Sequence, residues 1–132
     1  ECGGHYARAM SSWSLLTALT GWEYDGPRAQ LRIGPRCQPD ALAAFWCGPE
    51  GWGLLSQKRE GRTQRNEISV ANGFLRVREL TLPTPQPPEQ ARVELSGKAL
   101  QPAMEVRAGL AQLTLDATIK IDAGQALVVT LG

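Results

Sequence analysis

The segment at residues 67–80, EISVANGFLRVREL, limits the folds open to this chain more than any other stretch. Apolar and polar residues alternate on both sides of Asn72-Gly73, and such alternation is typical of half-buried strands. A type I′ turn needs positive φ at both central residues, which the pair Asn-Gly adopts at little cost. The segment therefore predicts a β-hairpin that turns at Asn72-Gly73.

The second half of this pattern contains a change of phase. Its apolar residues fall at Leu75 and Val77 and then at Leu80 and Leu82, so the spacing of two is broken between the pairs. One extra residue inserted into a strand produces such a shift. We therefore expect a β-bulge at residues 78–79.

Short alternating runs also fill the C-terminal part of the chain. They read ARVELSG, AMEVRAG, LAQLTLDATIKID and QALVVTLG, and Gly97, Gly109 and Gly124 punctuate them. The preceding PTPQPP is a stiff, extended connector that cannot join a central strand. Several short strands at these intervals predict an antiparallel β-sandwich.

The N-terminal residues have a helical period instead. Apolar side chains spaced three to four positions apart predict a helix over residues 4–20, and they are Tyr6, Met10, Trp13, Leu16 and Leu19 or Thr20. Gly21 follows, and a glycine at this place commonly ends a helix in the left-handed conformation. The predicted fold class is mainly β with one N-terminal helix (α+β).

Three segments between these regions have weaker patterns. WEYDGPRAQLRIGPR, at residues 22–36, predicts a hairpin that turns at residues 25–27 and has one polar face. PDALAAFW predicts a short helix capped near Asp40. QKREGRTQR, at residues 57–65, contains four basic residues and predicts a solvated loop.

Length and composition exclude several classes of protein. The 132 residues suffice for one domain, which buries roughly two thirds of the surface of its unfolded chain. The net charge of +1 gives no electrostatic preference for nucleic acid. No apolar run approaches the roughly 18 residues that a membrane span needs. We expect no nucleic-acid partner and no membrane span, and the cytoplasm is the favoured location.

The cysteines do not form a recognisable framework. Cys2, Cys37 and Cys47 are odd in number, and no two have the close spacing of metal ligands. We expect free thiols or small core residues, with a Cys37–Cys47 disulfide as the less favoured alternative. No metal site and no cofactor are expected.

The N-terminal helix carries the residues with the most chemical potential. His5 is the only histidine, so neither a metal trio nor a Ser-His-Asp set can be assembled, and a hydrogen-bonded structural role is favoured. Arg8 lies near a helix start, where a positive charge is unfavourable unless an anion compensates it. An exposed ion pair and ligand binding are equal alternatives for Arg8.

Aromatic and acidic residues leave two further alternatives open. The four tryptophans can stack on sugar faces or pack in the core, which is the commoner fate, and they are Trp13, Trp22, Trp46 and Trp52. A glycosidase needs two carboxyl groups across one cleft. The carboxylates near the helix and first hairpin form no pair that must converge, and they are Glu1, Glu23, Asp25 and Glu50.

Three stretches of the sequence resemble a known family. ECGGHYARAMSSWSLLTALTGWEYDGP, EGWGLLSQKR and RNEISVANGFLRVREL resemble the C-terminal end of bacterial members of glycoside hydrolase family 116, the β-glucosidase and glucosylceramidase-like enzymes. The resemblance covers roughly residues 1–82. It implies a parent with an N-terminal β-sandwich and a toroid of six α-helical hairpins. The family's glutamate nucleophile and aspartate acid/base lie upstream of the matching region, so no catalytic residue is expected in this chain.

The resemblance also implies roles for parts of the chain. Residues 1–21 would be the last helix of the toroid. The patterns described above divide the rest of the chain into β-hairpins with connecting segments at residues 22–82, a proline-rich connector at residues 83–90 and, at residues 91–132, strands that complete the sandwich. In the family an arginine five residues before a tryptophan binds an outer sugar hydroxyl. Arg8 and Trp13 have this spacing, and Glu1 and His5 belong to the same block. The implied substrate-binding residues are therefore Arg8, Glu1 and His5.

Two functions follow as expectations. The leading one is a C-terminal segment of a retaining β-glycosidase, which meets its β-linked glycoside through the parent and is inactive in isolation. The alternative is a stand-alone β-sandwich that binds carbohydrate or protein without catalysis. In isolation the apolar helix face, with Met10, Trp13 and Leu16, is expected to pack on its own sheet or on a second copy as a homodimer.

Overall fold

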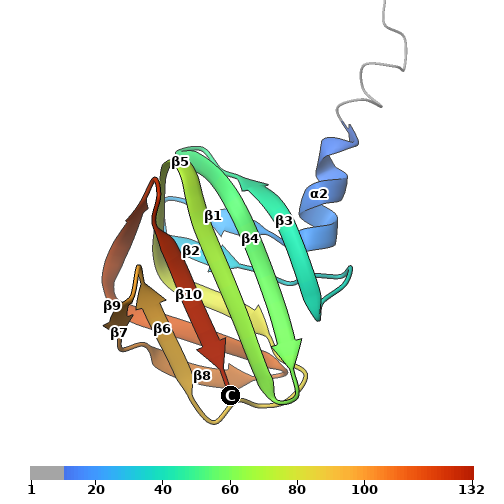
Figure 1. Cartoon of the computed structure of the whole chain (residues 1–132), viewed down its shortest axis with the longest axis vertical. Coiled ribbons are helices and arrows are strands. Elements are labelled where there is room, and N and C mark those ends of the chain that lie inside the picture. The colour runs from blue at the N-terminus through green and yellow to red at the C-terminus, as the bar shows by residue number, and fades with distance from the viewer. Residues whose placement is uncertain (1–10) are drawn as a thin grey trace, which may run out of the picture.

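The structure is a computed structural model that describes residues 11–132, and two β-sheets pack face to face in this region (Figure 1). The sheet in front in Figure 1, the front sheet, has the strand order β3 (Ala41–Cys47), β4 (Gly51–Glu60), the first half of β5 (Thr63–Pro83), β10 (Ala126–Leu131), β6 (Ala91–Leu95) and β7 (Lys98–Leu100). The rear sheet has the order β1 (Glu23–Asp25), β2 (Gln30–Arg32), the second half of β5, β9 (Leu110–Asp122) and β8 (Ala103–Arg107). The predicted class, mainly β with a helix before the strands, is confirmed.

Both sheets share β5, and this contradicts the prediction of a hairpin at Asn72-Gly73. Residues 63–73 pair with β4, and residues 74–83 pair with β9. The chain therefore passes from one sheet to the other at Asn72-Gly73 without reversing. Of the two residues only Gly73 has positive φ, at 73°, whereas a type I′ turn needs positive φ at both.

Glycines permit a close backbone approach at this crossing. A Cβ on Gly73 would lie 2.1 Å from the carbonyl oxygen of Glu50, and one on Gly53 would lie 1.9 Å from that of Ser69. The register of β4 and β5 also shifts beside Gly53. Further along β5 the predicted bulge is confirmed, because the amides of Arg78 and Glu79 both donate to the carbonyl of Ala29 (2.7 and 3.2 Å). The register with β9 also shifts between Val77 and Glu79.

The inner faces of the two sheets form one core. Leucines at register partners of neighbouring strands line its rear wall, among them Leu31, Leu80 and Leu113, each at most 4% exposed. Burying one such side chain contributes about 1.5–3 kcal/mol. The hairpin predicted at residues 22–36 is confirmed, since β1 and β2 pair antiparallel on either side of its turn. However, β2 joins the sheet through a parallel pairing with β5, so the sandwich is not wholly antiparallel.

Two predictions between residues 39 and 65 are wrong. The alanine-rich segment expected to be a helix from Asp40 is strand β3, because it pairs with β4 from Ala41 to Cys47. The expected solvated loop at residues 57–65 is the hairpin of β4 and β5, which turns at residues 61–62. Its Gln57 is buried and donates to the carbonyl of Pro39 (2.6 Å), so part of this polar run faces inward.

The C-terminal strands agree with the predicted pattern. The four alternating runs form β6, β8, β9 and β10, and the short β7 is an additional strand. Gly97, Gly109 and Gly124 have positive φ in the turns between strands. No strand occurs at residues 84–90 of the proline-rich connector, but its first residue, Pro83, ends β5 and pairs with Leu110, so the expectation that the connector joins no central strand is wrong at this residue.

Helix α2 (Trp13–Thr20) precedes the sandwich and confirms the described part of the predicted helix. Gly21 ends it with φ of 59°, as expected. The backbone amides of Gly34 and Arg36 donate to the carbonyls of Gly21 and Leu19 (3.1 and 2.9 Å), which fixes the end of the helix to the sandwich. The body of α2 extends away from the sheets (Figure 1).

Candidate functional site

Several residues singled out in the sequence lie outside the described part of the chain. These are Glu1, Cys2, His5, Arg8, Tyr6 and Met10, together with the side chain of Trp13. The proposed sugar-binding set and the proposed division into domains therefore stay predictions.

The remaining tryptophans divide between core and surface. Trp22 and Trp46 are buried and stack on each other, with ring centroids 4.9 Å apart and planes 12° from parallel. Trp46 also donates from Nε1 to the carbonyl of Ser69 (3.0 Å). Core packing is thus confirmed for both, whereas Trp52 is 46% exposed.

The candidate carboxylates of the described region pair with arginines. Glu23 contacts Arg32 at 3.6 Å, and Asp25 contacts Arg28 at 3.1 Å. Glu50 forms an ion pair with Arg76. Exposed ion pairs of this kind contribute about 0–1 kcal/mol, so these pairs do little for stability.

Cys37 and Cys47 are exposed free thiols, so the alternative of a disulfide between them is wrong. Within residues 11–132 no three His, Cys, Asp or Glu side chains come together as metal ligands could. A search of the same residues for a helix long and apolar enough to cross a membrane finds none.

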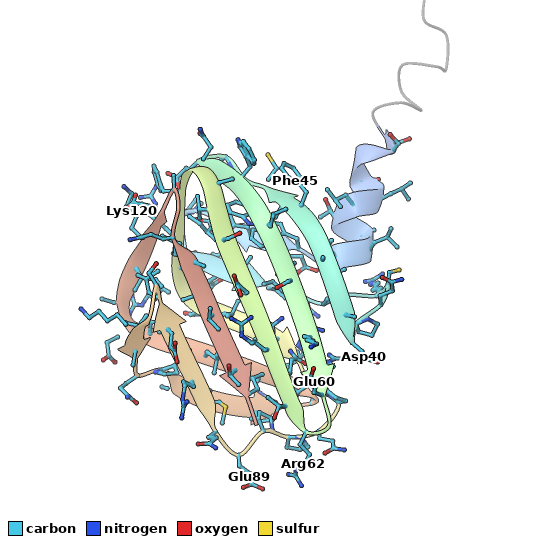
Figure 2. The ribbon with its side chains drawn as sticks, in the orientation of Figure 1. Asp40, Phe45, Glu60, Arg62, Glu89 and Lys120 are labelled. Carbon is cyan, nitrogen blue, oxygen red and sulfur yellow. The ribbon has the colours of Figure 1, made fainter. Side chains whose placement is uncertain are left out.

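Exposed apolar side chains gather on one side of the molecule. Six of the seven large apolar side chains exposed in the described region belong to α2, β3 and β4, and we call them the apolar surface: Leu15, Leu16, Leu19, Phe45, Trp52 and Leu54. Figure 2 shows Phe45 at the end of β3 that lies level with α2.

Strand register explains the β3–β4 part of this surface. Phe45 and Leu54 are direct partners, and opposed residues in a sheet point to the same side. The Phe45 and Trp52 rings lie 5.9 Å apart at an angle of 38°. A groove of about 360 Å³ adjoins them between β3, β4 and β5, with Leu54 and Ser69 in its lining. The sequence indicates this surface: in ALAAFWC and GWGLLS apolar residues occupy both of the alternating sets of positions, so one set must face outward.

Side-chain hydrogen bonds lie next to the point where β5 passes from one sheet to the other. The Tyr24 hydroxyl donates to the carbonyl of Arg76 (3.0 Å), and Arg76 Nε donates to Glu50 (3.2 Å). Burial raises the pKa of Tyr24, and the hydrogen bond with Glu50 raises the pKa of Arg76. The cations of Arg76 and Lys120 lie 5.5 and 4.5 Å from the ring centre of Phe74, and Figure 2 marks Lys120.

The comparisons with known proteins find similarity at the level of structure. No protein-family model matches the chain, and no curated protein matches it. Among solved structures the chain is similar to an α-L-rhamnosidase from Dictyoglumus thermophilum, with a TM-score of 0.45 and 10% identity. The match covers 86% of this chain and 12% of that one, so the chain spans only a small part of the length of the rhamnosidase.

Proposed function

We propose that this chain is a non-catalytic accessory module of a larger glycoside hydrolase, and that its apolar surface packs against the catalytic part. The exposure of Leu15, Leu16 and Leu19 on a helix that stands off the sandwich carries this role. Contiguous exposed apolar surface marks interaction sites on proteins. The sequence resemblance over residues 1–82 supports the class of the parent.

We further infer that the parent is a retaining β-glycosidase of the family 116 type, acting on a β-linked glycoside. Arg8 then binds an outer hydroxyl of the sugar, with Glu1 and His5 beside it, and the catalytic carboxylates come from upstream residues. A guanidinium presents paired donors, and each charge-assisted hydrogen bond contributes about 1.5–3 kcal/mol. This role positions the substrate and transfers no proton.

Leu19→Asp in the full reading frame tests the packing of the module. A charge placed in a buried apolar interface is unfavourable, so a lower melting temperature and slower hydrolysis of an aryl β-glucoside are expected. Val106→Asp is the matched control, because Val106 is also exposed, at 39%, but lies on β8 of the rear sheet. Equal effects of the two substitutions would contradict the proposed packing.

Arg8→Ala in the same enzyme tests the sugar-binding role. The expected result is a raised KM and a kcat/KM lowered by about tenfold or more, as for loss of a charge-assisted hydrogen bond. The retaining mechanism is tested separately, by following the anomeric configuration of the first product by NMR. Unchanged kinetics would refute the role of Arg8, while the packing of α2 is judged separately by Leu19→Asp.

One observation favours the alternative of a stand-alone binding module. Trp52 and Phe45 form an exposed aromatic pair, and such pairs occur at binding surfaces. A reading frame that continues upstream into a helical toroid supports the enzyme, whereas an initiator directly before Glu1 supports the module. In isolation, the apolar surface is proposed to pair two copies of the chain, which light scattering measures.

A further inference from the structure

A polar trough crosses the outer face of the rear sheet, away from the apolar surface. Two adjoining hollows of about 420 and 540 Å³ share Gln30 and Glu79 in their linings. The first extends over β1, β2, β5 and β9 to Gln112, and the second extends to Arg78 and Thr118. Together they form an elongated depression, which we call the polar trough.

Strand register places the polar side chains of the trough on one face. Gln30 pairs with Glu79, and Thr81 pairs with both Arg32 and Gln112. Opposed residues point to the same side of a sheet, and residues that alternate with them point to the other. The alternating leucines line the core, so the polar set faces outward as a group.

The centre of the trough is held in place by two amides. Nε2 of Gln30 and Nε2 of Gln112 both donate to Oε2 of Glu79, at 2.8 and 3.3 Å. Both amides use the same carboxylate oxygen, so Oε1 of Glu79 and the two amide oxygens are left as acceptors for a ligand. The arginines of the trough supply donors beside them.

The charges of the trough balance once the partner of Arg76 is included: the lining holds four arginines and three carboxylates, and Glu50, which lines neither hollow, pairs with Arg76. Asp25 pairs with Arg28, Glu23 with Arg32, and Arg76 with Glu50. The two remaining charged residues of the lining, Arg78 and Glu79, are opposite in sign. A phosphate or polyanion needs an excess of positive charge, which this balance does not provide.

We propose that the polar trough binds a neutral oligosaccharide. A hydroxyl both donates and accepts a hydrogen bond, so it matches a surface where carboxylate, amide and guanidinium groups alternate. An elongated, open depression suits a short chain of sugar units better than a single compact ligand. The inference concerns the rear sheet and does not depend on the packing of α2.

NMR titration of the 132-residue chain tests this binding. The probes are the neutral tetrasaccharides of glucose, xylose and N-acetylglucosamine, and a sulfated heparin tetrasaccharide is the anionic comparison. We expect one neutral probe to shift amides of β1, β2, residues 79–81 and β9, with a Kd of about 1 mM. The proposal is overturned if no neutral probe shifts these amides, if the shifts centre on Trp52, or if only the heparin probe binds.

Matched variants test the role of Glu79. Glu79→Gln keeps the size of the side chain but removes its charge, and a roughly tenfold weaker Kd is expected. Gln112→Ala removes one of the two amides and is expected to weaken binding as well. Glu94→Gln, on β6 of the front sheet, is the control and leaves the Kd unchanged. Equal affinity of Glu79→Gln and Glu94→Gln overturns the assignment.

The two proposals can fail separately. Leu19→Asp removes an apolar side chain of α2 and is expected to leave the oligosaccharide affinity of the isolated chain unchanged. A module that binds sugar but does not stabilise a parent enzyme would refute only the packing role. A module that stabilises the parent but does not bind sugar would refute only the trough.

Discussion

Asn72-Gly73 and Ser96-Gly97 are similar in sequence, but only the second reverses the chain. Ser96 and Gly97 both have positive φ, at 48° and 83°, and they join β6 to β7 with Leu95 opposite Lys98. At Asn72-Gly73 only Gly73 has positive φ, and β5 continues into the other sheet. Ser96-Gly97 therefore forms the tight turn that its sequence favours, whereas Asn72-Gly73 does not.

The partners of the flanking segments explain the difference. β6 and β7 pair with each other across their turn. The two halves of β5 have other partners, because the first half pairs with β4 and β10 and the second with β9 and β2. Pairing along both halves satisfies many more backbone groups than one tight turn would. Tertiary pairing thus overrides the strongest local hairpin signal in the sequence.

Among the substitutions at or near the crossing, Gly73→Ala is expected to cause the largest loss of stability. Its Cβ would meet a backbone oxygen of Glu50, and alanine at φ of 73° is strained. Overpacking and left-handed strain together lower the free energy of unfolding by about 3 kcal/mol or more. Urea denaturation followed by tryptophan fluorescence measures the loss.

Gly97→Ala is the matched control for the turn. Gly97 has φ of 83°, but a Cβ there would have no atom within 4 Å. Only the strain of about 1–2 kcal/mol remains. If Gly73→Ala lowers the free energy of unfolding no more than Gly97→Ala does, the crossing tolerates a side chain. The proposed difference between the two sites would then be wrong.

The sequence predicted those parts of the fold that depend on neighbours in the chain. The hairpin of β1 and β2, the end of α2 at Gly21 and the bulge at Arg78 each follow from a few adjacent residues. The alanines of β3 favour a helix locally, but pairing with β4 makes the segment a strand. Patterns that depend on a distant partner were therefore missed.

Tyr24→Phe is expected to have an intermediate effect, because it removes the hydrogen bond to Arg76 just beyond the crossing. Loss of one such bond costs about 1 kcal/mol at neutral pH. Burial raises the pKa of Tyr24 above the ordinary 10.0, so the unfolded chain ionises first. The stability from this shift is full below pH 10.0 and is lost as the pH rises through the folded pKa.

Denaturation at a series of alkaline pH values, together with tyrosinate absorbance, checks this prediction. Tyr24→Phe should abolish the alkaline loss of stability that is due to Tyr24. Tyr6→Phe, which alters the other tyrosine of the chain, is the control and should preserve it. The same pH profile in Tyr24→Phe and in the unaltered chain would contradict the assignment.

The two candidate surfaces differ in how far the sequence reveals them. The outward Phe45 and Trp52 can be inferred from runs in which both strand parities are apolar. The polar trough cannot be inferred in this way, because Gln30 meets Glu79 only through a parallel pairing of strands 49 residues apart. The predicted residues Glu1, His5 and Arg8 depend on the family resemblance and lie outside the described region.

Glu50→Gln is expected to have the smallest effect at the crossing. The substitution removes the ion pair with Arg76 but leaves the backbone carbonyl of Glu50, which accepts from the amide of Phe74 (3.0 Å). Exposed pairs contribute little and are screened by salt, so the loss should be smaller than that of Tyr24→Phe and should shrink as salt is added. Glu60→Gln is the control, because Glu60 pairs with Lys58 beside an ordinary turn (2.5 Å). If Glu50→Gln lowers the free energy of unfolding more than Gly73→Ala does, and the loss depends on salt, then the ion pair, and not the close backbone approach, stabilises the crossing of β5 between the sheets.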